Sequence, residues 1–186
     1  MRPFPESLRR SLESHGAGLT VLVLRMGAFG DILRTLPPVR LVRFALPEAR
    51  IFWVVDDRWE RALERHPDLD GCVALPRREW ADLSGSPSRW PALVASVRRV
   101  VRDLRALRPD LAPDFHGNLR SGRLGRLSGA PVRIGYAGHQ QQEGNRLFSP
   151  HSVPAGERRR SRMERNLDLV RALGIADRPL PGGGSP

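Results

Sequence analysis

The residues with the clearest chemical potential lie in one short loop near the amino end. Arg25 follows an aliphatic run at 20–24, and Gly27, Gly30 and Asp31 come directly after it. Such a run of β-branched and aliphatic residues is typical of a parallel strand that is covered on both faces. In open α/β sheets, ligands bind just beyond the carboxyl ends of the strands. Asp31 is therefore the first candidate for acid–base chemistry.

The sequence also allows a simpler role for Asp31. Asp is among the preferred residues at the amino cap of a helix, and a helix is expected to begin here. The loop is not a dinucleotide fingerprint, because Gly27 and Gly30 lack the third glycine of G-x-G-x-x-G and no Walker lysine follows. Two roles for Asp31 stay open, a helix cap or a chemical group, and nucleotide binding by this loop is disfavoured.

Composition limits the classes of partner. A chain of 186 residues suits one good core. Its 31 basic residues are all arginine and outnumber 20 acidic residues, which gives a formal charge of +11. This charge favours anionic partners such as nucleic acid, phosphorylated sugars or an acidic membrane surface. The single cysteine, Cys72, excludes an internal disulfide and a multi-cysteine metal site, and we expect it to pack as a small hydrophobe.

The two ends of the chain differ from its middle. Residues 1–18 contain no apolar signal core, and no run approaches the length of a membrane span, so we expect a cytoplasmic protein. This segment is expected to be an amphipathic or frayed leader that either touches a membrane surface or does nothing specific. Residues 176–186 have the composition of a linker. One domain is therefore expected over 19–175, with a further part of the protein beyond the linker.

Strands and helices are expected to alternate between these ends. The patterns predict strands at 20–24, 50–55, 71–75, 111–115 and 132–136, and helices at 39–46, 58–65, 90–107, 119–127 and 161–173. Pro113 removes a backbone donor and argues for an edge strand or a local break. The stretches 76–91 and 138–154 are expected to be irregular. The alternation predicts a Rossmann-like three-layer α/β domain with a mainly parallel sheet.

Several stretches in this order resemble a known family. They are Arg25 with Gly30, Asp31 and the following LRTLP, then ALPEARIFWVVDD at 45–57, RREW at 77–80, DFHGNLRS at 114–121, RIGY at 133–136 and ERNLDLVRALG at 164–174. Together they resemble the amino-terminal half of the lipopolysaccharide heptosyltransferases of glycosyltransferase family 9, with the heptosyltransferase I branch closest. The resemblance runs from about 19 to 175.

The resemblance implies a fold and an activity. The domain is expected to be the acceptor half of a GT-B glycosyltransferase, in which two Rossmann-like domains face each other across a cleft. The family transfers heptose from ADP-heptose to the Kdo region of lipid A, with inversion and without a metal or other cofactor. The carboxyl-terminal donor domain, where the nucleotide sugar is expected to bind, is absent from these 186 residues, so this chain alone is expected to be inactive. Peripheral contact with the inner face of the cytoplasmic membrane fits this activity, and a nucleic-acid partner is not expected.

The resemblance also assigns roles to residues. Asp31 corresponds to the family's proposed general base. The residues expected to bind the acceptor are Arg25, Gly30, Arg77, Arg78, His116, Asn118 and Arg120. Arginine suits an acidic acceptor, since its planar fork binds carboxylates and phosphates in two bonds. A helix amino end would lower the pKa of Asp31, which keeps it ionised and makes it a weak base.

Alternatives remain open for these residues and for the function. Arg77 and Arg78 are also consistent with a solvated loop pair, and His116 with a polar residue at a strand end. Trp53 is expected in the core, and Trp80 as an acceptor platform or a lid over the cleft. The competing functions are a family 9 transferase for another sugar or acceptor, and a non-catalytic basic binding module. The sequence lacks the interleaved aromatic and basic residues of single-strand binders.

Overall fold

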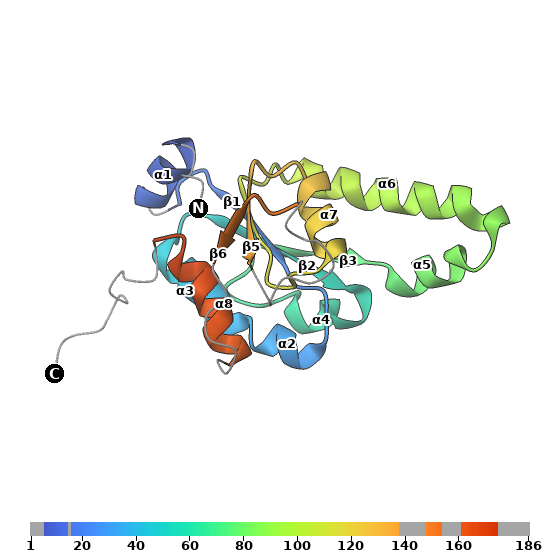
Figure 1. Cartoon of the computed structure of the whole chain (residues 1–186), viewed down its shortest axis with the longest axis horizontal. Helices are drawn as coiled ribbons and strands as arrows, with labels where there is room; N and C mark the ends of the chain where they lie inside the picture. Colours follow the sequence, from blue (N-terminus) through green and yellow to red (C-terminus); the bar gives the residue numbers. More distant parts are fainter. Residues whose placement is uncertain (1–5, 15, 138–147, 154–160, 175–186) are drawn as a thin grey trace.

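The computed structural model describes residues 6–14, 16–137, 148–153 and 161–174. The strands are β1 (Thr20–Leu24), β2 (Arg50–Asp56), β3 (Gly71–Leu75), β4 (Leu111–Pro113), β5 (Val132–Tyr136) and β6 (His151–Val153). They form one sheet in the order β3-β2-β1-β4-β5-β6, and each pairing of neighbouring strands is parallel (Figure 1). This is the strand order of a Rossmann fold, so the predicted fold class is confirmed.

Helices cover both faces of the sheet. The helices are α1 (Glu6–Glu13), α2 (Phe29–Leu33), α3 (Leu36–Ala45), α4 (Glu60–Leu63), α5 (Arg77–Ser84), α6 (Trp90–Ala106), α7 (Leu119–Leu127) and α8 (Arg162–Arg171), with 3-10 turns at Asp57–Trp59 and Pro87–Arg89. Alternate residues of a strand point to opposite faces. Val21 and Val23 accordingly join a core with α1, α3 and α8, whereas Leu22 and Leu24 join a second core with α6 and α7. The predicted three layers are present.

The position of β1 explains where a ligand site can form. β1 lies between β2 and β4, with Thr20 opposite Arg50 and Val21 opposite Leu111. The chain leaves β1 toward α2 and α3 on one face and leaves β4 toward α7 on the other (Figure 1). The two connections therefore separate at the carboxyl ends of β1 and β4. Such a switch point opens a crevice in doubly wound sheets.

The prediction that Pro113 marks an edge strand is wrong, because β4 lies between β1 and β5. The alternative of a local break fits the structure. β4 has only three residues, and its pairing with β1 consists of Val21 with Leu111 and an isolated bridge between Leu24 and Asp114. Pro113 lies between these two contacts and has no N–H to donate, so the ladder is interrupted at that point.

Two stretches predicted to be irregular contain regular structure. Within 76–91 lie α5 and a 3-10 turn, and within 138–154 the described part contains β6, which pairs with β5. In α5 the half-buried Trp80 packs against the second core, and its Nε1 donates to Ser96 Oγ of α6 at 3.0 Å. Trp80 therefore joins α5 to α6 and does not line the cavity described below. A helix with so few apolar residues and a strand of three residues leave little periodicity to detect.

Other expectations for the core hold. Trp53 is fully buried, and Cys72 packs against the same core, where burial raises the pKa of its thiol to about 11. The alternative of a frayed leader over 1–18 does not fit the described part of that segment, because α1 buries Leu8 and Leu12 in the first core. Among the described residues, every helix falls short of the length and apolar character needed to cross a bilayer.

Candidate active site

A cavity of about 410 Å³ opens at the carboxyl edge of the sheet, at the switch point between β1 and β4. Its walls come from segments that are far apart in the sequence: Arg25, Gly27, Ala28 and Asp31 after β1, Asp56 and Arg58 at the end of β2, Arg77 at the start of α5, Phe115 and His116 after β4, Tyr136 in β5, and Arg162, Arg165 and Asn166 in α8. The cavity thus lies where open α/β domains bind ligands.

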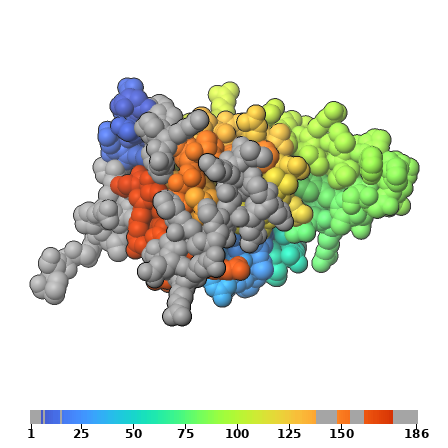
Figure 2. Space-filling model, viewed as in Figure 1, coloured from blue at the N-terminus to red at the C-terminus, as the bar shows by residue number. Residues whose placement is uncertain are grey.

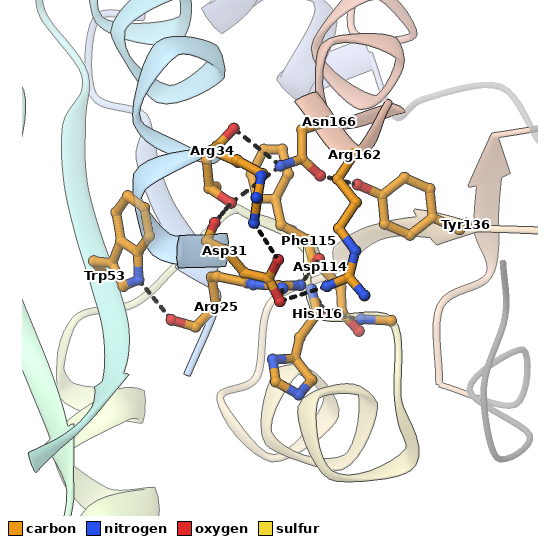
Figure 3. A network of polar contacts seen from close by, with 12 residues as sticks. Arg25, Asp31, Arg34, Trp53, Asp114, Phe115, His116, Tyr136, Arg162 and Asn166 are labelled. Atoms are coloured by element: carbon orange, nitrogen blue, oxygen red, sulfur yellow. Dashed lines mark hydrogen bonds and ion pairs between the residues drawn. The ribbon is translucent and has the colours of Figure 1, made fainter. Parts of the chain in front are cut away.

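Arg25 is fixed at the floor of this cavity. Its side chain is only 9% exposed, and its Nη1 donates to the carbonyl oxygen of Phe115 at 2.6 Å. Its own carbonyl oxygen accepts a hydrogen bond from Trp53 Nε1 at 2.8 Å. The other terminal nitrogen, Nη2, forms an ion pair with Asp31 Oδ2 (Figure 3). Arg25 therefore connects the ends of β1, β2 and β4 and directs one charge at Asp31.

The interpretation of Asp31 as a helix cap is wrong. Ala28 occupies the cap position of α2, and Asp31 is the third residue of that helix. The Asp31 side chain is 13% exposed and faces the cavity. Besides Arg25, it contacts Arg162 Nη1 at 2.6 Å from Oδ2 and Arg34 Nη1 at 3.4 Å from Oδ1. The Asp31 carboxylate thus faces the cavity and pairs with arginines rather than with the backbone.

The surrounding guanidiniums set the protonation state of Asp31. Burial alone would raise its pKa, but Arg25 and Arg162 outweigh burial and hold the pKa of Asp31 below its ordinary value. The predicted lowering of the Asp31 pKa is therefore confirmed, but its cause is the neighbouring arginines and not the amino end of a helix. Asp31 is ionised at neutral pH and is a weak base. It accepts a proton readily only from a group that has become acidic during a reaction.

A second carboxylate, Asp56, lies at the end of β2 and is 1% exposed. Its Oδ2 lies 3.4 Å from Arg77 Nη1 and 3.7 Å from Arg58 Nη2, and its Oδ1 has no hydrogen-bond partner among the described residues. Burial raises the pKa of Asp56, and the arginines only partly oppose this. A Cβ at Gly27 would lie 3.1 Å from Asp56 Oδ2, so the close approach of the two loops favours glycine there. A carboxylate after a buried strand is the signal that could have identified Asp56.

His116 is the neutral member of the site. Its Nδ1 is buried without a hydrogen-bond partner among the described residues. Burial, together with the charges of Arg25 and Arg120, lowers the pKa of His116 to about 4. The turn that carries it is held by Asp114, whose Oδ1 accepts from the backbone nitrogens of His116 at 3.0 Å and Gly117 at 2.9 Å. His116 therefore presents an uncharged imidazole to the cavity at neutral pH.

Helix α8 closes one wall through a buried hydrogen-bond network. Asn166 Nδ2 donates to Thr35 Oγ1 at 3.1 Å, and Asn166 Oδ1 accepts from Tyr136 Oη at 2.6 Å (Figure 3). Thr35 Oγ1 in turn donates to the carbonyl oxygen of Asp31 at 2.8 Å. These bonds tie α8 to β5 and α2, so the first turn of α8 is held beside Asp31.

Arg162, Arg165 and Asn166 are cavity residues that the sequence does not single out. A local signal was present, because Ser161 and Glu164 form a capping box: Glu164 N donates to Ser161 Oγ at 3.2 Å, and Ser161 N donates to Glu164 Oε2 at 2.7 Å. That pattern places Arg162 in the first helical turn. It does not show which residue α8 packs against.

The structure brings together part of the predicted site. Arg25, Asp31, Arg77 and His116 line the cavity, and Gly30 borders an adjoining hollow that shares Asp31 and Arg162.

The other predicted residues lie outside the cavity walls. Asn118 caps α7, where its Oδ1 accepts from Ser121 N at 3.0 Å. Arg78 and Arg120 are exposed and do not line the cavity, although the charge of Arg120 acts on both Asp56 and His116. Arg123 and Arg126 of α7 are also exposed and lie on a solvated helix face.

Comparison with known proteins supports the predicted resemblance. Lipopolysaccharide heptosyltransferase 1 of Campylobacter coli is 28% identical over 61 residues, which cover 33% of this chain and 18% of that protein. The Pseudomonas aeruginosa protein of the same name is 27% identical over 112 residues, which cover 60% of this chain and 30% of that protein. No protein-family model matches the sequence. The aligned segments thus cover less than a third of either relative, and the predicted resemblance to lipopolysaccharide heptosyltransferases is confirmed for that part.

Solved structures support the fold. E. coli heptosyltransferase WaaC with ADP-2-deoxy-2-fluoro heptose has a TM-score of 0.73 and 22% identity, over 84% of this chain and 49% of that one. A glycosyl transferase family 9 protein from Veillonella parvula has a TM-score of 0.65 and 20% identity, over 87% of this chain and 42% of that one. At these identities the likeness establishes the fold of the aligned part, which is about half of each solved chain.

The buried imidazole gives a testable prediction for the site. NMR titration of His116 should give a pKa of about 4, because burial and two nearby guanidiniums disfavour the charged form. The unfolded chain takes up this proton near the ordinary value of 6.5, so the folded state should lose stability as the pH falls from 6.5 toward 4. His116→Asn should remove that part of the pH dependence. A measured pKa near 6.5 would contradict the burial of this side chain.

Proposed function

We propose that this chain is the amino-terminal, acceptor-binding half of a GT-B heptosyltransferase. The complete enzyme would transfer heptose from ADP-heptose to the Kdo–lipid A inner core of lipopolysaccharide, with inversion and without a metal. The observation that carries the proposal is the ionised Asp31 in a guanidinium-lined cavity at the switch point of the sheet. The curated heptosyltransferase relatives and the fold of WaaC support it.

The proposed reaction needs a base at the acceptor hydroxyl. The hydroxyl oxygen attacks the anomeric carbon of heptose, and the bond from that carbon to the diphosphate breaks, so the electron pair leaves with ADP. The hydroxyl proton passes to the Asp31 carboxylate. Attack on the face opposite the leaving group inverts the anomeric centre. Because Asp31 is a weak base, proton transfer would occur late, when the new bond has made the hydroxyl acidic.

The arginines suit an acidic glycolipid. Arg77 lines the cavity with a half-exposed side chain, and its contact of 3.4 Å with Asp56 Oδ2 leaves donors free for a ligand. Arg78 and Arg120 are exposed, and we propose that they meet more distant charges of the acceptor. Carboxylates of Kdo and phosphates of lipid A both accept the planar guanidinium fork. Arg25 would hold Asp31 in place rather than bind the acceptor directly.

The nucleotide sugar would bind outside this domain. WaaC is a heptosyltransferase solved with ADP and with an ADP-heptose analogue, and this chain aligns with about half of it. We propose that the ADP-heptose site belongs mainly to a second domain that follows residue 186 in the complete protein. Turnover therefore needs both halves, and the activity tests below use the full-length gene product.

A membrane-bound acceptor suggests peripheral contact with the inner face of the cytoplasmic membrane. Helix α6 carries a stripe in which apolar residues alternate with arginines: Trp90, Val94, Val97, Arg98, Val101, Arg102 and Arg105, beside Leu127. The helices α5 and α6 form an arm on one side of the molecule (Figure 2). Apolar side chains flanked by basic ones bind anionic lipid surfaces. We propose that this stripe contacts the membrane.

Vesicle co-sedimentation tests the membrane contact. The protein should bind vesicles that contain anionic phosphatidylglycerol and should bind neutral phosphatidylcholine vesicles less, with the difference shrinking at high salt. Val94→Asp should weaken the binding, because it places a negative charge in the exposed stripe. The control is Ala81→Asp, at an exposed position of the neighbouring helix α5. Equal sedimentation with both kinds of vesicle would contradict the contact.

Asp31→Asn tests the proposed base. The full-length enzyme should lose about 10²- to 10⁴-fold in kcat for transfer from ADP-heptose to Kdo–lipid A, since an amide cannot take the proton. Asp103→Asn, on the exposed surface of α6, is the matched control and should keep kcat. Retained turnover in Asp31→Asn would contradict the role of Asp31 as the general base. Transfer from another nucleotide sugar instead of ADP-heptose would favour a different family 9 specificity.

Arg77→Ala tests acceptor binding. Loss of one charge-assisted hydrogen bond costs about 1.5 to 3 kcal/mol, so the acceptor KM should rise about tenfold or more. The KM for ADP-heptose should stay unchanged. Arg126→Ala removes an exposed arginine of α7 outside the cavity and should alter neither constant. An unchanged acceptor KM in Arg77→Ala would contradict the assignment.

A further inference from the structure

The ion pair between α8 and α2 joins residues that are 131 positions apart. Arg162 Nη1 lies 2.6 Å from Asp31 Oδ2, the same oxygen that Arg25 contacts. Two guanidiniums therefore share one carboxylate oxygen, while Arg34 approaches the other at 3.4 Å. A hydroxyl that gives its proton to Asp31 needs a lone pair on one of these oxygens. The free protein holds its proposed base partly covered.

The two arginines on Oδ2 are held very differently. Arg25 is 9% exposed and is fixed by a second bond to the carbonyl oxygen of Phe115. Arg162 has a side chain that is 58% exposed, and Asp31 is its one hydrogen-bond or ion-pair partner among the described residues. Figure 3 shows Arg162 reaching down from the first turn of α8 across the cavity to Asp31. Arg162 can thus turn to a ligand without breaking any other described bond.

We propose that Arg162 is an acceptor-binding residue that exchanges Asp31 for a carboxylate of the acceptor sugar and thereby uncovers Asp31 for the hydroxyl proton. This inference rests on the proposed function. It makes an acidic group beside the reacting hydroxyl a requirement for full activity, because a neutral sugar would leave Arg162 on Asp31. Arg162 is then a specificity-determining residue of the same site.

The charges around Asp31 make this exchange feasible. Arg162 loses one carboxylate and gains another, so the number of ion pairs is preserved and no buried charge is left alone. Four groups face Asp31 from the surrounding elements: Arg25 directly after β1, Arg34 at the carboxyl end of α2, Arg162 of α8 and the neutral His116 after β4. When Arg162 leaves, Arg25 still keeps Asp31 ionised. The carboxylate nevertheless becomes a stronger base, since one nearby positive charge has gone.

The test compares two acceptors and three full-length proteins. The acceptors are Kdo–lipid A and an analogue whose Kdo carboxylate next to the reacting hydroxyl is converted to a carboxamide. The proteins are the wild type, Arg162→Gln and Arg171→Gln. Arg171 is an exposed residue of the same helix that pairs with Asp168 and lies outside the cavity walls, so it serves as the matched control.

With the carboxamide analogue, the wild type and Arg171→Gln should show an acceptor KM about tenfold higher than with Kdo–lipid A, and a lower kcat. The reason is that the Arg162 guanidinium then stays on Asp31. In Arg162→Gln both differences between the acceptors should disappear. If Arg162 had a purely structural role, Arg162→Gln would instead change KM and kcat by the same factor for both acceptors. An unchanged carboxylate preference in Arg162→Gln would overturn the inference and leave the proposed function intact. Wild-type protein that fails to transfer heptose to Kdo–lipid A would overturn the proposed function and this inference together.

Discussion

The buried ion pair between Arg25 and Asp31 is the constraint on which the site depends. A guanidinium that is 9% exposed is costly unless a carboxylate and further acceptors surround it. Asp31 supplies the charge, and the carbonyl oxygen of Phe115 supplies a second acceptor. Meeting these needs brings together the ends of β1 and β4 and the first turn of α2. The pair thus fixes the geometry of the cavity floor before any ligand arrives.

The cavity around this pair contains titratable groups with opposite tendencies. Arginines hold Asp31 ionised, burial raises the pKa of Asp56, and His116 is kept neutral. Different environments of this kind are common where a protein handles protons and charged ligands. A network of ion pairs with only a structural role could shift the pKa of one of these groups. Such a network would not need a cavity of about 410 Å³ lined by half-exposed arginines. The combination favours an acidic substrate near a poised carboxylate.

Hydrophobic periodicity and turn residues in the sequence predicted those strands, helices and site residues that lie within one short segment. The buried run of β1, the glycine loop and Asp31 lie within a dozen residues, and the helical pattern of α6 extends over 17 residues. Such signals are strong because neighbouring positions share one element. They identified the switch-point carboxylate and the opposite Arg25. The same patterns did not predict α5 and β6, because these elements contain too few apolar residues to show a helical or strand periodicity.

The missed residues depend on contacts that no local pattern contains. Arg162 meets Asp31 because α8 packs into the first core and Asn166 ties this helix to Thr35 and Tyr136. The type of residue 31 suits a helix cap, but the sequence does not show that α2 begins at Phe29, two residues before Asp31. Arg78 and Asn118 match the family pattern, yet one is exposed outside the cavity and the other caps α7. Helix packing decided the case of Arg162, whereas the exact start of a helix decided those of Asp31 and Asn118.

The most direct measurement is a crystal structure of the full-length protein with a Kdo-containing acceptor. We expect an acceptor hydroxyl within about 3 Å of an Asp31 carboxylate oxygen, while Arg25 keeps its contacts with Asp31 and Phe115. An acceptor bound elsewhere, with Asp31 still covered by its arginines, would contradict the role of Asp31 as the base.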